Sequence, residues 1–142
     1  MSVTFAETMA GTFTAPDGSR EPIVFTVNAK AEKAKAFITG APIRLEGLIT
    51  VGGICRDAPA TGSLEVRLLT DRTLVYQLVF AGDDGATYRY KGQKDVTPMN
   101  LLKSMTTLRG TLYREEETLG AAELTFSLRD IPEFMRSFAL GM

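Results

Sequence analysis

Two ionisable side chains, Glu7 and Lys94, occupy positions where the surrounding pattern is apolar. In FAETM, Glu7 lies between Phe5 and Met9, and residues two apart in a strand share a face. Lys94 lies four residues after Tyr90, and this even spacing places both side chains on the same face of a strand. A charge facing an apolar interior is costly unless an opposite charge or a polar ligand compensates it. We therefore expect Glu7 and Lys94 to lie close together, at the interior or its mouth, as a structural ion pair or as contacts to a ligand head group.

Three tyrosines at strand spacing are further candidates for contact with a ligand, through their hydroxyl groups. Aromatic residues at such spacing more often pack in a core, so both interpretations stay open for each of them. The candidate ligand-binding set is Glu7, Lys94, Tyr76, Tyr88 and Tyr90. No residue is assigned a catalytic role.

The composition excludes several kinds of site. The chain has no histidine, which excludes Ser-His-Asp and Cys-His catalysis and metal sites built on imidazole. Cys55 is the single cysteine, so it cannot form a zinc cage, an iron–sulfur site or an internal disulfide. We expect Cys55 to be a small buried thiol and not a nucleophile. Asp83-Asp84 lack the further oxygen ligands that calcium needs and indicate a turn. We expect neither a metal nor a cofactor.

Alternation of apolar and polar residues predicts the elements that carry these side chains. Period-two runs recur from Val3 to Leu128, separated by turn sequences such as PDGS and GDDG, and indicate about eight antiparallel strands. We predict an all-β fold for residues 1–142, a single closed β-barrel of the lipocalin or calycin kind, because closure removes edge strands. Short helices are expected near residues 30–38 and 131–139, with a third at 99–105.

The two ends of the chain carry similar patterns, which suggests an internal duplication of a hairpin and a short helix. FTVNAKAEKAKAF at residues 25–37 resembles FSLRDIPEFMRSF at 126–138, and Gly11-Thr12-Phe13 resembles Gly110-Thr111-Leu112. Two such hairpins lying side by side would close the sheet. Chance similarity of amphipathic hairpins is the alternative.

Charge and hydropathy limit the class of protein, the partners and the location that we expect. Hydrophobic residues make up 44% and charged residues 23% of the 142 residues, values typical of a soluble globular domain. The net charge of −1 favours neither nucleic acid nor an acidic membrane as a partner. No run is long enough to span a membrane, and the first residues do not read as a secretion signal, so a cytoplasmic location is expected.

FAETMAG, YKGQK, MTTLRGTLY and GAAELTFSLRDIPEFMRSF together resemble a small β-barrel domain that accompanies GMC-type, sterol-oxidase-like oxidoreductases and related bacterial proteins. The similarity covers nearly the whole chain but includes no flavin-binding unit. It implies an accessory or binding domain, with a partner oxidoreductase, and transfers no catalytic residue.

The expected function is non-catalytic binding of a small, largely apolar ligand such as a lipid or sterol. One alternative is a filled barrel that acts as a structural or interaction module, for example as a homodimer. The other is a cofactor-free isomerase or cyclase that uses Glu7 as acid or base together with a tyrosine.

Overall fold

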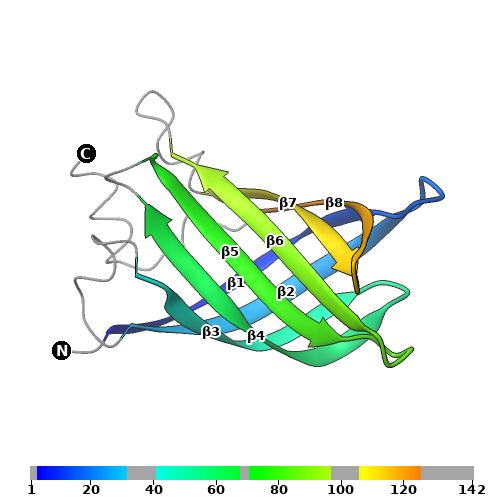
Figure 1. Cartoon of the computed structure of the whole chain (residues 1–142), viewed down its shortest axis with the longest axis horizontal. Helices are drawn as coiled ribbons and strands as arrows, with labels where there is room; N and C mark the ends of the chain where they lie inside the picture. Colours follow the sequence, from blue (N-terminus) through cyan, green and yellow to red (C-terminus); the bar gives the residue numbers. More distant parts are fainter. Residues whose placement is uncertain (1–2, 32–40, 68–70, 97–105, 126–142) are drawn as a thin grey trace.

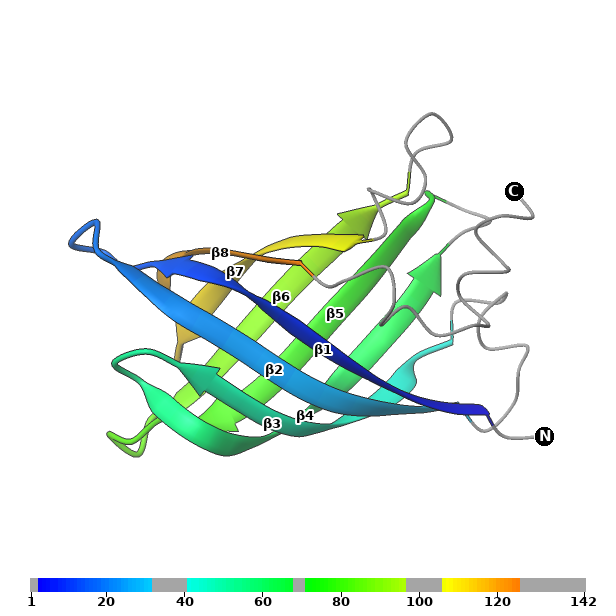
Figure 2. The ribbon, with the colours of Figure 1, turned by 180° about the vertical axis from the view of Figure 1, so that it is seen from behind.

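The computed structural model of the chain is a closed, eight-stranded antiparallel barrel in which each strand pairs with its neighbours in sequence and β8 returns to β1. Figures 1 and 2 show the strands winding obliquely around one axis. The structure describes residues 3–31, 41–67, 71–96 and 106–125. The strands are β1 (Val3–Thr14), β2 (Arg20–Ala31), β3 (Ile43–Val51), β4 (Cys55–Arg67), β5 (Thr73–Ala81), β6 (Thr87–Asp95), β7 (Thr107–Arg114) and β8 (Glu117–Thr125). The predicted closed all-β fold is confirmed at this level.

The alternation in the sequence becomes an inside and an outside. Along β6, exposed and buried residues alternate without interruption from Thr87 to Asp95. The inward positions of all eight strands together form one core cluster. Many inward side chains have no accessible surface at all, among them Met9, Ile23, Phe25, Leu45, Leu64 and Tyr90 at 0%. Side chains therefore fill the space around these residues.

The two ends of the barrel are built differently. At one end, tight turns join the strands in pairs, and Gly18 and Gly85 adopt φ values of 87° and 82° that favour glycine. Backbone hydrogen bonds link neighbouring turns there, such as Asp83 N–H to the Ile54 carbonyl at 2.8 Å. Strands β2, β4, β6 and β8 terminate at the opposite end, which we call the far end.

The prediction of a helix near residues 30–38 is wrong for its first two residues, which belong to β2. Residues 28–31 continue β2, where Lys30 pairs with Thr4 of β1 and Arg44 of β3. Ala29 faces inward with 0% exposure. Pairing on both sides, together with burial of alternate residues, outweighs the helical preference of this alanine- and lysine-rich stretch. The rest of this segment, and the helices expected at 99–105 and 131–139, lie outside the described residues.

The two terminal hairpins agree with the proposed duplication as far as the structure describes them. Phe13 and Leu112 are both buried, and Gly11 and Gly110 both occupy inward positions where a side chain would collide with the backbone of the next strand. The pairs Phe25/Phe126 and Phe37/Phe138 reach beyond the described residues, so the duplication stays a prediction.

Candidate functional site

Glu7, Tyr76 and Lys94 form one hydrogen-bonded group inside the barrel, which we call the buried trio. The Tyr76 hydroxyl donates to Glu7 Oε1 at 2.8 Å and accepts a hydrogen bond from Lys94 Nζ at 3.0 Å. Lys94 Nζ lies 3.9 Å from Glu7 Oε2, close enough for an ion pair but too far for a hydrogen bond. The expected proximity of Glu7 and Lys94 is confirmed, and Tyr76 joins them.

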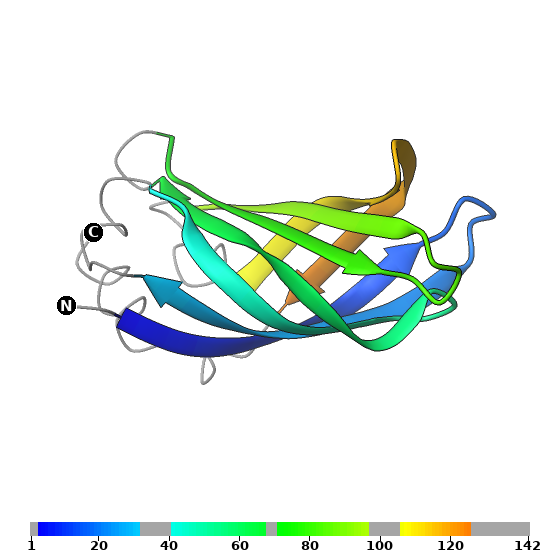
Figure 3. The ribbon, with the colours of Figure 1, turned by 60° about the horizontal axis from the view of Figure 1, so that its bottom comes forward.

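The buried trio crosses the barrel. Glu7 comes from β1, whereas Tyr76 and Lys94 come from β5 and β6, which lie on the other side of the closed strand order. Figure 3 shows β1 and β2 along one side of the barrel and β5 and β6 along the opposite side. Glu7 is 4%, Tyr76 1% and Lys94 2% exposed. The group therefore joins opposite walls through the interior, not along one wall.

Gly92 makes room for this arrangement. In the β5–β6 register Tyr76 pairs with Gly92, and Leu74 pairs with Lys94, so Tyr76 and Lys94 are diagonal neighbours on the inner face. A Cβ at Gly92 would collide with the Tyr90 ring. The missing side chain thus leaves space that the Tyr90 ring occupies. The sequence analysis did not single out Gly92, although its place between two inward residues in YKGQK was a usable signal.

A mainly aromatic layer lies next to the buried trio, on the side away from the far end. Phe25 packs between two tyrosine rings, with centroid distances of 6.4 Å to both Tyr76 and Tyr90. The Tyr90 hydroxyl donates to the carbonyl oxygen of Ala122 at 3.2 Å. Tyr90 is therefore a core residue with a satisfied hydroxyl, one layer away from the charged groups.

Burial shifts the ionisation of the buried trio. It raises the pKa of Tyr76 well above the usual value, and the adjacent Glu7 carboxylate raises it further. It lowers the pKa of Lys94 from 10.5 to about 8, although the Glu7 carboxylate acts in the opposite direction. At neutral pH the tyrosine is neutral and the lysine is mainly protonated, so Lys94 donates to the Tyr76 hydroxyl, which in turn donates to Glu7.

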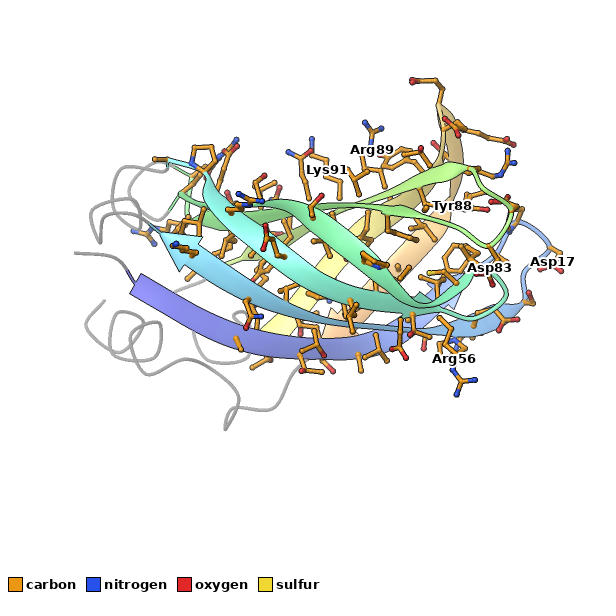
Figure 4. All side chains as sticks on the ribbon, turned by 90° about the horizontal axis from the view of Figure 1, so that it is seen from below. Asp17, Arg56, Asp83, Tyr88, Arg89 and Lys91 are labelled. Carbon is orange, nitrogen blue, oxygen red and sulfur yellow. The ribbon has the colours of Figure 1, made fainter. Side chains whose placement is uncertain are left out.

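Tyr88 lies at the end of the barrel with the tight turns, away from the buried trio. Its hydroxyl donates to Asp84 Oδ2 at 2.9 Å, and its ring stacks on Phe80 at 5.7 Å. Figure 4 shows Tyr88 near the β5–β6 turn that carries Asp83. Asp84 also accepts hydrogen bonds from Ala86 N–H and from Arg114. The Asp-Asp pair therefore belongs to a turn, as the sequence indicated, and Tyr88 supports that turn.

Other candidates do not form a site. Cys55 is buried, and burial raises the pKa of its thiol, which makes it a poor nucleophile. Within the described residues, no three acidic, cysteine or histidine side chains gather to hold a metal ion. A groove of about 420 Å³ follows the outer β1–β8 seam. Small or exposed residues line it, including Ala10, Thr12 and Ala121, so nothing in it is built to hold a ligand in place.

No family model matches this chain, and neither a curated protein nor a solved structure matches it. Within the part of the chain that the structure describes, no helix has both the length and the apolar character needed to cross a membrane. Function is therefore inferred from the geometry of the buried trio.

Proposed function

We propose that this chain is a lipocalin-like binding barrel for a small, largely apolar ligand, whose polar group contacts the buried trio. The observation that carries the proposal is the trio itself. A buried ion pair is often no more stabilising than apolar side chains of the same volume, because both charges lose their hydration. Buried titratable groups with shifted pKa values also concentrate at functional sites.

The position of the buried trio favours entry from the far end. Leu74 in β5 and Val96, the residue after β6, are the buried residues beyond Tyr76 and Lys94, so the charged groups lie about one layer of side chains from where the strands end. Leu74 is 0% and Val96 4% exposed, so a ligand would have to displace this one layer, whereas toward the tight turns it would meet the larger core that includes Met9, Phe25 and Tyr90. A ligand would therefore place its head group at the trio and its apolar body beside Leu74 and Val96.

This proposal can be tested with uniformly labelled protein and simple amphiphiles. Octyl and dodecyl alcohols, acids and amines are titrated while backbone amide shifts are recorded by NMR, and native mass spectrometry of the purified protein looks for a lipid adduct. We expect at least one series to bind and to shift the amides of Glu7, Tyr76 and Lys94 most. The absence of any adduct and of any saturable shift at these amides would refute a binding function.

A second candidate is a filled barrel that serves as a structural or interaction module. It is supported by the inaccessible core, and by a buried trio whose described side chains leave no fully buried polar atom without a partner. Exposed Val24, Leu48 and Val79 on the outer wall would suit a protein contact, with a second copy or a partner oxidoreductase.

A double-mutant cycle separates the two candidates. If the trio is structural, Glu7→Gln and Lys94→Met each destabilise the protein, and the double variant is more stable than the sum of the two changes predicts. If the trio serves a ligand, each single variant loses binding while the ligand-free protein keeps most of its stability.

A further inference from the structure

The outer face of β6 carries two cations without a carboxylate partner in the part of the chain that the structure describes. Arg89 and Lys91 are exposed, and Figure 4 shows both pointing away from the barrel on the same side. Neither side chain takes part in an ion pair with a described residue. We call these two residues, together with their register neighbours Val79 and Tyr113, the basic wall.

The basic wall has apolar contact area as well as charge. In the strand register Val79 of β5 lies beside Arg89, which lies beside Tyr113 of β7. The Arg89 guanidinium group lies over the Tyr113 ring, 4.7 Å from its centroid, and Val79 is 42% exposed. Tyrosine and arginine are enriched where proteins contact one another. The composition of the basic wall is therefore typical of a protein interface.

The same chain carries a matching negative surface in the turn between β7 and β8. Glu115, Glu116 and Glu117 are consecutive and exposed, and we call them the acidic turn. Glu115 Oε1 accepts a hydrogen bond from Thr87 N–H at 2.8 Å, which attaches the turn to the start of β6. Within the described residues, none of the three glutamates forms an ion pair. The acidic turn therefore presents uncompensated negative charge.

The acidic turn and the basic wall lie side by side in one copy without forming an ion pair. Lys91 pairs with Thr111 of β7, so Glu115 lies four residues further along the chain, or about 13 Å away at the rise of a strand. Figures 3 and 4 show the β7–β8 turn rising above β6, on the side to which Arg89 and Lys91 point. A two-fold rotation about an axis between the two surfaces places each acidic turn over the basic wall of the other copy.

We propose that two copies of this chain associate as a two-fold symmetric dimer, in which the acidic turn of each copy lies on the basic wall of the other. Symmetry repeats the contact, so each charge acts twice in the dimer. The net charge of −1 gives the chain no general attraction for polyanions, and both complementary surfaces belong to the chain itself. These facts favour a second copy over an unrelated acidic partner. The inference is independent of whether the barrel binds a ligand.

The first test uses the native chain. Sedimentation equilibrium is measured in about 0.05 M and about 0.5 M sodium chloride, between which the screening length falls about threefold. We expect a monomer–dimer equilibrium at low salt, with a dissociation constant on the order of 100 μM as for small, wet interfaces. High salt should weaken it by about tenfold or more, since the charges are exposed. A chain that stays monomeric at low salt, or a dimer that salt does not weaken, overturns the proposal.

Charge reversal then locates the contact. The wall variant combines Arg89→Glu with Lys91→Glu, and the turn variant combines Glu116→Lys with Glu117→Lys, all at exposed positions. Each variant alone should stay monomeric where the native chain dimerises, because like charges then face each other. An equimolar mixture of the two should form a heterodimer, since both contacts then join opposite charges. Native mass spectrometry identifies the heterodimer by its mass.

A matched control carries the same change of net charge elsewhere. Arg20→Glu combined with Lys30→Glu alters exposed residues of β2, which lies on the opposite side of the barrel from β6, and should dimerise like the native chain. Circular dichroism checks that each variant keeps the barrel; if a double variant loses it, Lys91→Glu alone replaces the wall variant. Native-like dimerisation of the wall variant, or a mixture that stays monomeric, shows that these surfaces do not meet. Loss of the dimer in Leu48→Asp but not in the wall variant assigns it to another face and equally refutes the proposal.

Discussion

Tyr76 stands at the centre of the buried trio because a hydroxyl can serve a carboxylate and an ammonium group at once. The Tyr76 hydroxyl links Glu7 and Lys94 by hydrogen bonds, whereas their direct separation of 3.9 Å exceeds hydrogen-bond length. Hydrogen bonds to charged groups are about twice as strong as neutral ones, and chains of them reinforce one another in a low-dielectric interior. The tyrosine hydroxyl therefore matters more to stability than its small size suggests.

Removing that hydroxyl should be clearly destabilising. Tyr76→Phe keeps the ring against Phe25 but deletes both hydrogen bonds, and we expect a loss of about 2 to 3 kcal/mol in the free energy of unfolding. Urea denaturation measures it. Tyr113→Phe is the matched control, because Tyr113 is half-buried on the outer wall with Arg89 over its ring, and it should change stability by less than about 0.5 kcal/mol. Equal effects of the two substitutions would contradict a structural role for the Tyr76 hydroxyl.

The lowered pKa of Lys94 makes stability depend on pH in a defined window. Its folded value of about 8 lies below the ordinary 10.5, so between these pH values the unfolded chain binds more protons than the folded one. Stability therefore rises with pH through this window, by a few kcal/mol at most. Below pH 8 both states hold the proton, and the cost of burying the charge is fully present.

Comparing the native protein with Lys94→Met isolates this contribution. Tyr76 acts in the opposite direction above pH 10, because the folded state keeps a phenol proton that the unfolded chain loses, but that contribution is common to both proteins. We expect the stability difference between native protein and variant to shift in favour of the native protein from pH 8 to pH 10. Lys91→Met, at an outward position of the same strand that Figure 4 shows pointing away from the barrel, should show no such trend. A pH-independent difference for Lys94→Met would mean that Lys94 titrates normally.

At the scale of strands, glycines at inward positions allow neighbouring backbones to approach closely. A Cβ at Gly62 of β4 would meet the carbonyl oxygen of Gln77 in β5. We expect Gly62→Ala to cost about 1 to 3 kcal/mol, because the contact is with backbone and cannot be relieved by a rotamer change. Thr61→Ala, at the adjacent exposed position, is the control for chain and strand effects. Similar thermal unfolding of both variants would show that the strands separate at little cost.

Alternation in the sequence predicted which way side chains face, but not how high they lie along the barrel. Glu7, Tyr76, Tyr88, Tyr90 and Lys94 all face inward as their spacing indicated. Tyr88 nevertheless lies at the end opposite the buried trio, because strand tilt and stagger set height and depend on pairing between distant strands. The helical preference of residues 28–31 failed for the same reason: β1 and β3 pair with this stretch on both sides. A local sequence pattern shows neither the height of a residue along the barrel nor the distant strands with which it pairs.

For the whole molecule, closure is the property that distinguishes a barrel from an open sheet. β1 pairs with β2 over residues 3–14, whereas its described pairing with β8 covers residues 10–13 against 122–125. Across that seam Gly11 faces Leu124, and a Cβ at Gly11 would collide with the backbone of residues 123 and 124. Close approach of β1 and β8 therefore depends on a residue without a side chain.

A valine at this position should force the seam apart. We expect Gly11→Val to lower the free energy of unfolding by about 1 to 3 kcal/mol or more and to speed amide exchange at Thr12 and Leu124 before other strands are affected. The newly exposed edges should also promote association, visible as a larger sedimentation coefficient at high protein concentration. Ala10→Val adds the same β-favouring side chain one residue earlier, where the position is exposed and faces the outer groove, so it should be tolerated. If Gly11→Val remained monomeric with exchange at the seam equal to that of Ala10→Val, closure would not depend on contact at Gly11.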